Sequence, residues 1–324
     1  MKGGFPMCTS IAKQLDSFYF GRNMDLSYEF GQQVVVAPRQ YPFHFRCQGD
    51  CTQHHALIGM ARVQDGYPLY AEAANEHGLC MAGLNFPQST YYFVEKSADK
   101  DNVSPFELIP WVLGQCASVD EAEALLRRTH LVDIPFAEGI PPTPLHWHVA
   151  DASRSIVAEP MADGLHIHHN PIGVMTNEPP FDFHMTNLRQ YLQLSPKQPV
   201  SAFPEAAGLT PFGWGFGALG MPGDTSPASR FVRVAFHAMN AVPEGGPGQF
   251  FHLLDTVAMP RGSVQDKNGY EFTLYSCCID AAKGIYYYRT YGNHRITAVS
   301  MGEKDGTALR CTPLRREEDI LWEA

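Results

Sequence analysis

Residues 9–20, TSIAKQLDSFYF, mix apolar and polar positions on both sides of a turn-like Leu-Asp-Ser. Short runs of this kind, bounded by turn residues, are typical of paired strands. We therefore predict that the chain opens with a β-hairpin. Further strands are expected at VVVAP (34–38), HALIGMARV (55–63) and GLCMAGLNF (78–86).

Two segments that begin with serine predict the first helices. Ser104-Pro105-Phe106-Glu107 and Ser118-Val119-Asp120-Glu121 both place Glu three residues after Ser, which is the pattern of a capping box. Pro105 is compatible with the first helical position. We expect the second helix to end near Arg128, because its pattern stops there.

The remainder of the chain alternates between blocks of strands and blocks of helices. Strands are expected over 145–169 and in EFTLYSCCI, GIYYYRTY and ITAVSM, and helices over 227–241 and 248–259. Residues 179–225 are rich in Pro and Gly, which predicts a long irregular stretch with a functional or assembly role. Because strands and helices do not alternate as βαβ units, the pattern indicates an α+β fold.

The composition limits the classes of function. The 324 residues contain 44% hydrophobic residues, show no repeats and no low-complexity linker, and are expected to form a single domain. The net charge of −10 and the lack of basic runs argue against a nucleic-acid partner and favour a small-molecule substrate. Eight scattered cysteines indicate reduced thiols rather than a disulfide framework. No membrane span or signal peptide is evident, so a cytoplasmic protein is expected.

One pattern suggests a dinucleotide cofactor and is rejected. Gly215-Phe216-Gly217-Ala218-Leu219-Gly220 matches the dinucleotide pattern G-x-G-x-x-G, but no strand-like run precedes it and Met-Pro-Gly-Asp follows, so no dinucleotide is expected.

The histidines and nearby cysteines raise the question of a metal. His146/His148 and His166/His168 each place two imidazoles on one face of a strand, and a local cluster is formed by Cys47, Cys51, His54 and His55. None has the tight paired spacing of a zinc site, so we expect no metal and no cofactor. A Cys–His protease dyad stays possible, but no local signature supports it.

Five separated motifs carry the chemistry. They are Met7-Cys8-Thr9-Ser10, Gly21-Arg22-Asn23-Met24-Asp25, Ala82-Gly83-Leu84-Asn85-Phe86-Pro87, Gly173-Val174-Met175-Thr176-Asn177 and Gly223-Asp224-Thr225-Ser226-Pro227-Ala228-Ser229-Arg230-Phe231. In these residues and their order, the chain resembles the choloylglycine hydrolase family of conjugated bile acid hydrolases and penicillin V acylases. The resemblance extends from Cys8 to about residue 300. It implies a four-layer αββα sandwich of the N-terminal nucleophile hydrolase type.

The resemblance makes Cys8 an N-terminal nucleophile. Its α-amino group would act as the base, because an α-amine has a pKa of about 7.7–8.0 and lies beside the thiol. No catalytic histidine is then needed. Arg22 would favour the thiolate, and Asp25 would orient the α-amino group.

The resemblance assigns the remaining site residues as well. Asn177 and Asn85 would form the oxyanion hole, and Arg230 would complete the polar cluster. Met24, Phe136 and Ile140 match family positions that line the apolar acyl pocket.

The N-terminus departs from many relatives, which begin directly at Met-Cys. Residues 1–7 would be a propeptide, an extension from a different start codon or an artificial extension, and residues 8–324 a single catalytic domain. The spacing between Cys8 and the Gly21 motif is also shorter than in some relatives, which indicates a tighter hairpin. Relatives with a long insert at 179–213 use it to build tetramers, so a homotetramer is expected.

The activity favoured by the resemblance is hydrolysis of glycine- or taurine-conjugated bile acids. Asn85 after Gly-Leu favours this branch of the family. The alternative within the family is a penicillin V acylase or an acylase for other N-acyl amides. Outside this function class, an inactive binding relative and a histidine-rich metal protein stay open.

Overall fold

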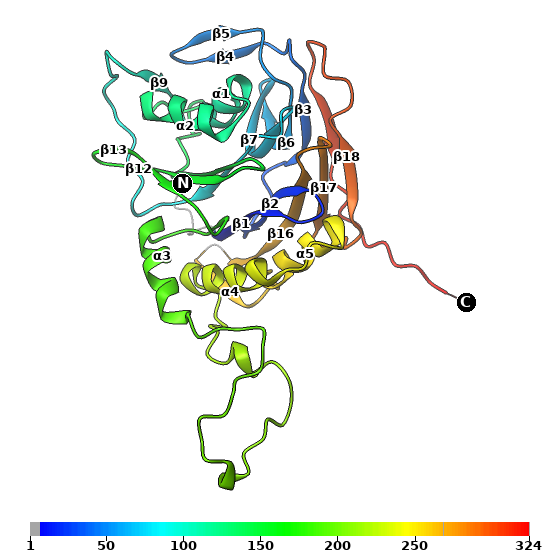
Figure 1. Ribbon diagram of the computed structural model, residues 1–324. Coiled ribbons are helices and arrows are strands. Elements are labelled where there is room, and N and C mark those ends of the chain that lie inside the picture. Colours follow the sequence, from blue (N-terminus) through cyan, green and yellow to red (C-terminus); the bar gives the residue numbers. More distant parts are fainter. Residues whose placement is uncertain (1–6, 268, 324) are drawn as a thin grey trace.

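The computed structural model describes residues 7–267 and 269–323, and two large sheets dominate it (Figure 1). The first sheet has the order β14-β1-β2-β16-β17-β18, with β15 paired to β16. Its strands are β1 (Met7–Gln14), β2 (Phe18–Leu26), β14 (Val174–Met175), β15 (Val264–Asp266), β16 (Gly269–Asp280), β17 (Ile285–Thr290) and β18 (Thr297–Ser300). All of these neighbours pair antiparallel.

The second sheet has eight strands in the order β13-β12-β11-β8-β7-β6-β3-β19. They are β3 (Gln33–Ala37), β6 (Leu57–Gln64), β7 (Tyr67–Asn75), β8 (Cys80–Asn85), β11 (Leu145–Ala150), β12 (Ser155–Met161), β13 (Gly164–His169) and β19 (Arg310–Pro313). Two small pairs accompany the large sheets, namely β4 (Phe43–Phe45) with β5 (Gly49–Cys51) and β9 (Asp101–Val103) with β10 (Thr129–Leu131).

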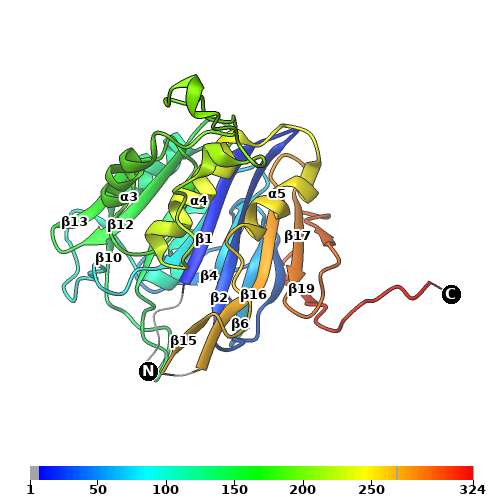
Figure 2. The same ribbon diagram turned by 90° about the horizontal axis from the view of Figure 1, so that it is seen from below.

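Helices cover the outer face of each large sheet (Figures 1 and 2). The α-helices are α1 (Leu108–Gln115), α2 (Val119–Arg128), α3 (Phe181–Leu188), α4 (Pro227–Asn240) and α5 (Gly246–Asp255). Short 3₁₀ turns occupy η1 (Pro105–Glu107), η2 (Arg189–Tyr191), η3 (Glu205–Ala207) and η4 (Phe216–Ala218). α4 and α5 pack on the first sheet, and α1 and α2 pack on the second. This arrangement confirms the predicted αββα sandwich.

Burial of apolar side chains holds these layers together. One hydrophobic cluster joins the first sheet to α4 and α5 and extends between the two sheets, with Phe20 and Phe250 among its fully buried members. A second cluster lies between the second sheet and α1 and α2, around Trp147 and Val112. Each fully buried large apolar side chain contributes about 1.5–3 kcal/mol. The sandwich therefore encloses a buried layer between its sheets, in which polar groups must find partners.

Most predicted elements are confirmed. The opening hairpin is β1 and β2, with Leu15 N bonded to Ser17 O across its turn. The capping residues act as expected: Glu107 Oε2 accepts from Ser104 N, and Ser118 Oγ accepts from Glu121 N. The G-x-G-x-x-G segment contains only the turn η4, with no strand leading into it, so it lacks the context of a dinucleotide site.

Other predictions are wrong in part. Strands β7 and β19 were not predicted, and α5 begins and ends earlier than the expected 248–259. The stretch 179–225 is not irregular throughout, because it contains α3. The backbone N–H of Phe181 at the start of α3 donates to Glu159 Oε1, 22 positions away in the chain, at 2.9 Å. A cap supplied by tertiary contact leaves no local signal in the sequence.

We call residues 192–226 the arm. Figure 1 shows it projecting away from the sandwich between α3 and α4. Most of its large apolar side chains are exposed, and Val200, Phe212 and Trp214 are 95%, 95% and 92% exposed. Among the described residues, no helix is both long and apolar enough to span a membrane.

Candidate active site

The opening hairpin sets the position of Cys8. In the register of β1 and β2, Cys8 lies opposite Met24 and Ser10 lies opposite Arg22. Residues opposite one another, and their diagonal neighbours two positions away, share one face of a sheet. Cys8, Met24 and Arg22 therefore share the face that looks toward the second sheet. The Cys8 thiol lies 3.9 Å from Met24 Sδ and is 2% exposed.

Arg22 is buried between the sheets. Its NH1 group donates to Gly83 O at 2.6 Å and lies 3.6 Å from Glu72 Oε2. Its Nε and NH2 groups have no hydrogen-bond partner among the described residues. Burial raises the pKa of the Cys8 thiol above its ordinary value, and the Arg22 charge is the largest influence that lowers it. The positive charge of Arg22 therefore acts toward a lower pKa of the thiol, although burial outweighs it in the chain that carries residues 1–7.

Asp25 lies on the other face of β2. Its Oδ1 accepts a hydrogen bond from Thr273 Oγ1 at 2.6 Å, and its Oδ2 has no hydrogen-bond partner among the described residues. Burial raises the pKa of Asp25 to about 6, while Arg230, Thr273 and Arg22 act in the opposite direction. The backbone N–H of Asp25 donates toward the Cys8 thiol, which favours the thiolate.

Asn177 and Arg230 meet at the backbone of Cys8. Asn177 Oδ1 accepts from the Cys8 backbone N at 2.8 Å and from Arg230 NH2 at 2.8 Å. Arg230 NH1 donates to Cys8 O and to Thr9 Oγ1, both at 2.5 Å. The cap that starts α4, Ser226 Oγ accepting from Ser229 N, holds the helix that carries Arg230. Arg230 therefore completes the polar cluster around Cys8.

Asn85 reaches the same cluster from the second sheet. Asn177 Nδ2 donates to Asn85 O at 2.9 Å. The Nδ2 group of Asn85 is buried and has no hydrogen-bond partner among the described residues. A buried donor without a partner is costly, by roughly 1–3 kcal/mol, and in native proteins often marks a functional role. The structure thus brings together all six polar residues selected from the sequence.

The three apolar positions belong to two different hydrophobic clusters. Met24 contacts Cys8 and belongs to the cluster between the sheets. Phe136 belongs to the second cluster, where its ring lies 5.2 Å from that of Phe106 and 5.9 Å from that of Tyr67. Ile140 packs at the edge of the second cluster, and its carbonyl accepts from Phe136 N. Phe136 and Ile140 are therefore neighbours, and Met24 belongs to the cluster between the sheets.

One group among the described residues has the donors for a metal ion: His55, Glu76 and His77. The imidazoles bond to each other, with His77 Nε2 at 3.1 Å from His55 Nδ1. Glu76 is already paired with Arg39 at 2.5 Å and with Lys304 at 3.6 Å. Two cations on this carboxylate compete with a metal, so the group does not fit a metal centre well. All eight cysteines are free thiols.

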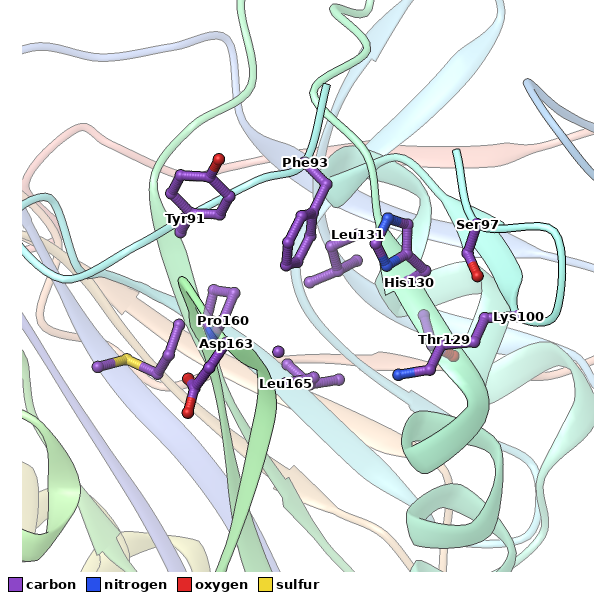
Figure 3. A pocket seen from close by; sticks show the side chains of 12 residues that line it. Tyr91, Phe93, Ser97, Lys100, Thr129, His130, Leu131, Pro160, Asp163 and Leu165 are labelled. Atoms are coloured by element: carbon purple, nitrogen blue, oxygen red, sulfur yellow. The ribbon is translucent and has the colours of Figure 1, made fainter. Parts of the chain in front are cut away.

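Two cavities do not have Cys8 in their lining. The first, of about 230 Å³, has Tyr91, Phe93 and His130 on one side, with Lys100 and Asp163 also on its wall (Figure 3). The second, of about 490 Å³, is lined in part by Thr273 and Tyr275. None of the nine selected residues lines either cavity. Neither cavity is therefore the candidate active site.

Several residues of the site were not selected from the sequence. Glu72 contacts Arg22 from the unpredicted strand β7, Thr273 bonds Asp25, and Thr9 bonds Arg230. Glu271 is 3% exposed and accepts a hydrogen bond from the backbone N–H of Met7. A correct prediction of alternation in β7 would have marked Glu72 as a carboxylate that faces the core. The contacts of Thr273 and Glu271 come from β16, which pairs with β2, and the contact of Thr9 with Arg230 joins β1 to α4.

The chain is similar to known proteins over most of its length. Residues 8–312 match the family model of linear amide C–N hydrolases, choloylglycine hydrolase family. The chain is 45% identical over 318 residues to a bile salt hydrolase/transferase of Lactiplantibacillus plantarum, covering 96% of this chain and 98% of the relative.

Two solved structures resemble the fold. A mutant of conjugated bile acid hydrolase from Clostridium perfringens superposes with a TM-score of 0.91 at 38% identity, over 97% of this chain and 99% of that chain. Penicillin V acylase from Agrobacterium tumefaciens has a TM-score of 0.72 at 18% identity, over the same shares of the two chains. The second likeness concerns the fold alone.

Proposed function

The chain belongs to the choloylglycine hydrolase family and is a linear amide C–N hydrolase, and from this premise we propose that it hydrolyses glycine- and taurine-conjugated bile acids. The observation that carries the proposal is the convergence of Cys8, Asn177 and Arg230 at one buried point, with Arg22, Asp25 and Asn85 around it. These residues supply a nucleophile, cations and amide donors, which are the groups that acyl transfer needs.

In the proposed mechanism, removal of residues 1–7 turns the Cys8 amide nitrogen into a free α-amine. The amine takes the thiol proton, and the thiolate attacks the carbonyl carbon of the bile acid amide. The Nδ2 groups of Asn85 and Asn177 would stabilise the oxyanion of the tetrahedral intermediate. Loss of one such donor typically reduces transition-state stabilisation by about 3 kcal/mol.

The intermediate then collapses. The C–N bond breaks, the leaving amine of glycine or taurine takes the proton from the Cys8 ammonium, and a thioester remains on Sγ. Water, deprotonated by the same α-amine, attacks the thioester carbonyl carbon. The C–S bond then breaks, the free bile acid leaves, and the Cys8 thiolate takes back the proton from the α-ammonium. Atoms and charges balance without a metal or cofactor. Activity is therefore expected to survive dialysis against EDTA.

The acyl side of the substrate would supply most of the binding. Met24 lies beside the thiol, and Phe136 and Ile140 offer apolar surface. At ~25 cal/mol per Å², an apolar contact of about 200 Å² contributes about 5 kcal/mol before ordering costs.

We further propose that the enzyme is a cytoplasmic homotetramer and that conjugated bile acids are its small-molecule substrates.

A side-by-side release assay on glycocholate, taurocholate and penicillin V tests the substrate. We expect both bile salts to have a higher kcat/KM than penicillin V. Phe136→Ala should lower kcat/KM for glycocholate and for taurocholate to a similar extent, because the residue would contact the steroid that both share. The ratio of the two kcat/KM values should therefore stay nearly unchanged. Faster turnover of penicillin V would move the chain to the acylase branch, and a ratio altered by Phe136→Ala would contradict the assigned pocket.

The name of the Lactiplantibacillus relative adds acyl transfer as a second candidate activity. A thioester on Cys8 can be attacked by an amine as well as by water. Glycocholate incubated with an excess of taurine should then yield taurocholate, detected by mass spectrometry. The absence of taurocholate while cholate accumulates would restrict the chain to hydrolysis.

A further inference from the structure

His146 on β11 is buried between two groups that can only accept hydrogen bonds. Its Nδ1 lies 3.2 Å from Glu159 Oε1, and its Nε2 lies 3.0 Å from the carbonyl oxygen of Thr176. The side chain is 2% exposed. Burial opposes ionisation of Glu159, but the contacts with His146 and His168 and the hydrogen bond from the backbone N–H of Phe181 outweigh it and lower the pKa of Glu159 to about 2. Glu159 is therefore a carboxylate at neutral pH.

Two acceptors require two donors from one imidazole. A neutral imidazole carries one N–H and would leave either Glu159 or Thr176 facing a lone pair. A polar group left unpaired in this buried position is costly, by roughly 1–3 kcal/mol. Only the imidazolium, with an N–H on both nitrogens, satisfies the two contacts.

His148 provides the contrast, two positions along the same strand. Its Nδ1 and Nε2 each lie 2.7 Å from a hydroxyl, that of Ser10 and that of Ser155. A hydroxyl can donate or accept, so the neutral ring is fully satisfied. Burial, together with the nearby His146, lowers the pKa of His148 to about 3. The two histidines are equally buried but are expected to carry different charges.

His146 also contacts both asparagine-bearing segments of the site. Thr176, which accepts from its ring, precedes Asn177. Phe86, which follows Asn85, stacks on the ring with centroids 4.2 Å apart and planes at 6°. A cationic ring on an aromatic face gains attraction beyond apolar contact. One side chain thus ties the end of β8 to the end of β14.

We propose that His146 is a charged positioning residue that fixes Asn85 and Asn177 relative to Cys8. Its role in turnover rests on the proposed function, whereas its charge does not. The ionisable groups around it are Glu159 in direct contact, His168 and Asp182 beyond that carboxylate, and the buried His148 and His184. His184 donates from Nε2 to Asn177 O, and burial lowers its pKa to about 4, so it is neutral.

Nitrogen-15 NMR of the histidine rings tests the charge on the intact protein. At neutral pH we expect both ring nitrogens of His146 to carry protons, and one ring nitrogen of His148. The His146→Gln and His148→Gln variants assign the two signals, and through-bond correlation to the backbone assigns them if a variant does not fold. A single proton on His146 at neutral pH would overturn the inference, whatever the enzyme hydrolyses.

Kinetics test the positioning role. His146→Gln should lower kcat on glycocholate on the order of 10–100-fold with KM nearly unchanged, because misplaced asparagines affect the transition state more than binding. His148→Gln is the control matched for burial and strand, and should lower thermal stability while kcat stays near that of the wild type. Phe86→Leu, which removes the stack and keeps both hydrogen bonds, should lower kcat to a smaller extent.

Equal loss of kcat in His146→Gln and His148→Gln would show a structural role alone and overturn the positioning proposal. A wild-type protein with two protons on His146 but no action on bile acids would contradict the proposed function while supporting the assigned charge.

Discussion

Arg22 on β2 and Glu72 on β7 link the two sheets of the sandwich, with NH1 of Arg22 3.6 Å from Oε2 of Glu72 and both side chains buried. Glu72 also accepts from the hydroxyls of Tyr275, at 3.0 Å, and Tyr286, at 2.6 Å. A buried cation needs a compensating charge or several acceptors. Glu72 therefore holds Arg22 from the side of the second sheet.

Loss of this carboxylate should destabilise the fold. Glu72→Gln leaves Arg22 buried without a counter-charge, which typically costs about 3–5 kcal/mol. Urea unfolding monitored by circular dichroism measures the change in the free energy of unfolding. Tyr275→Phe removes one hydrogen bond from the same cluster and should cost only about 1 kcal/mol. A Glu72→Gln variant no less stable than Tyr275→Phe would show that the charge pair contributes little.

Replacement of the nucleophile should separate chemistry from stability. Cys8→Ser is expected to lower turnover on the order of 10³-fold or more, because a hydroxyl is much harder to ionise than a thiol. The fold should persist, as judged by circular dichroism. Cys80→Ser and Cys278→Ser are the matched controls, since both thiols are buried and burial raises the pKa of each. A folded Cys80→Ser protein without activity, beside an active Cys8→Ser protein, would refute the assignment.

The active form is expected to begin at Cys8. In the chain that carries residues 1–7, the Cys8 nitrogen is an amide, and it donates to Asn177 Oδ1. An amide cannot act as the base, so two matched proteins, one with residues 1–7 and one starting at Cys8, should differ in activity. Intact-mass analysis verifies each N-terminus before assay. Full activity in a protein whose mass still includes residues 1–7 would exclude the α-amine as the base.

Glu271 should make stability depend on pH in the chain that carries residues 1–7. Burial and the nearby charge of Asp25 raise its pKa from 4.5 to about 8. Below pH 4.5 the group is protonated in both folded and unfolded chains. Between about pH 4.5 and 8 the unfolded chain releases the proton and the folded chain keeps it, so the stabilising contribution is lost as pH rises through this window. Thermal unfolding over the same range should show a smaller decline for Glu271→Gln. Parallel curves for the two proteins would contradict a raised pKa.

The arm is expected to mediate assembly. Phe212 and Trp214 are 95% and 92% exposed, and large apolar side chains gathered on one segment often mark an interaction surface. Sedimentation of the wild-type protein should give a tetramer, and the double variant Phe212→Ser, Trp214→Ser should dissociate. Trp322→Ser is the control, because Trp322 is 85% exposed outside the arm. A monomeric wild-type protein, or dissociation by Trp322→Ser, would contradict this role.

Local patterns in the sequence predicted the elements that local interactions stabilise. The hairpin of β1 and β2 follows from alternation around a turn, and α2 and α4 begin at serine caps whose partners lie three residues away. The five motifs likewise predicted six polar residues, and the fold brings them to one place. Their proximity could not be derived from spacing, since Cys8 and Arg230 are 222 positions apart.

By itself, then, the sequence determined several of the long strands, the capped helices, the family and the candidate nucleophile, because each depends on residue types within a few positions or on motifs in order. Tertiary structure alone decided what surrounds them. The start of α3 relies on Glu159, Arg22 relies on Glu72, and the charge of His146 depends on acceptors 13 and 30 positions away. Burial and hydrogen-bond partners set these properties, and both arise only when distant strands pack together.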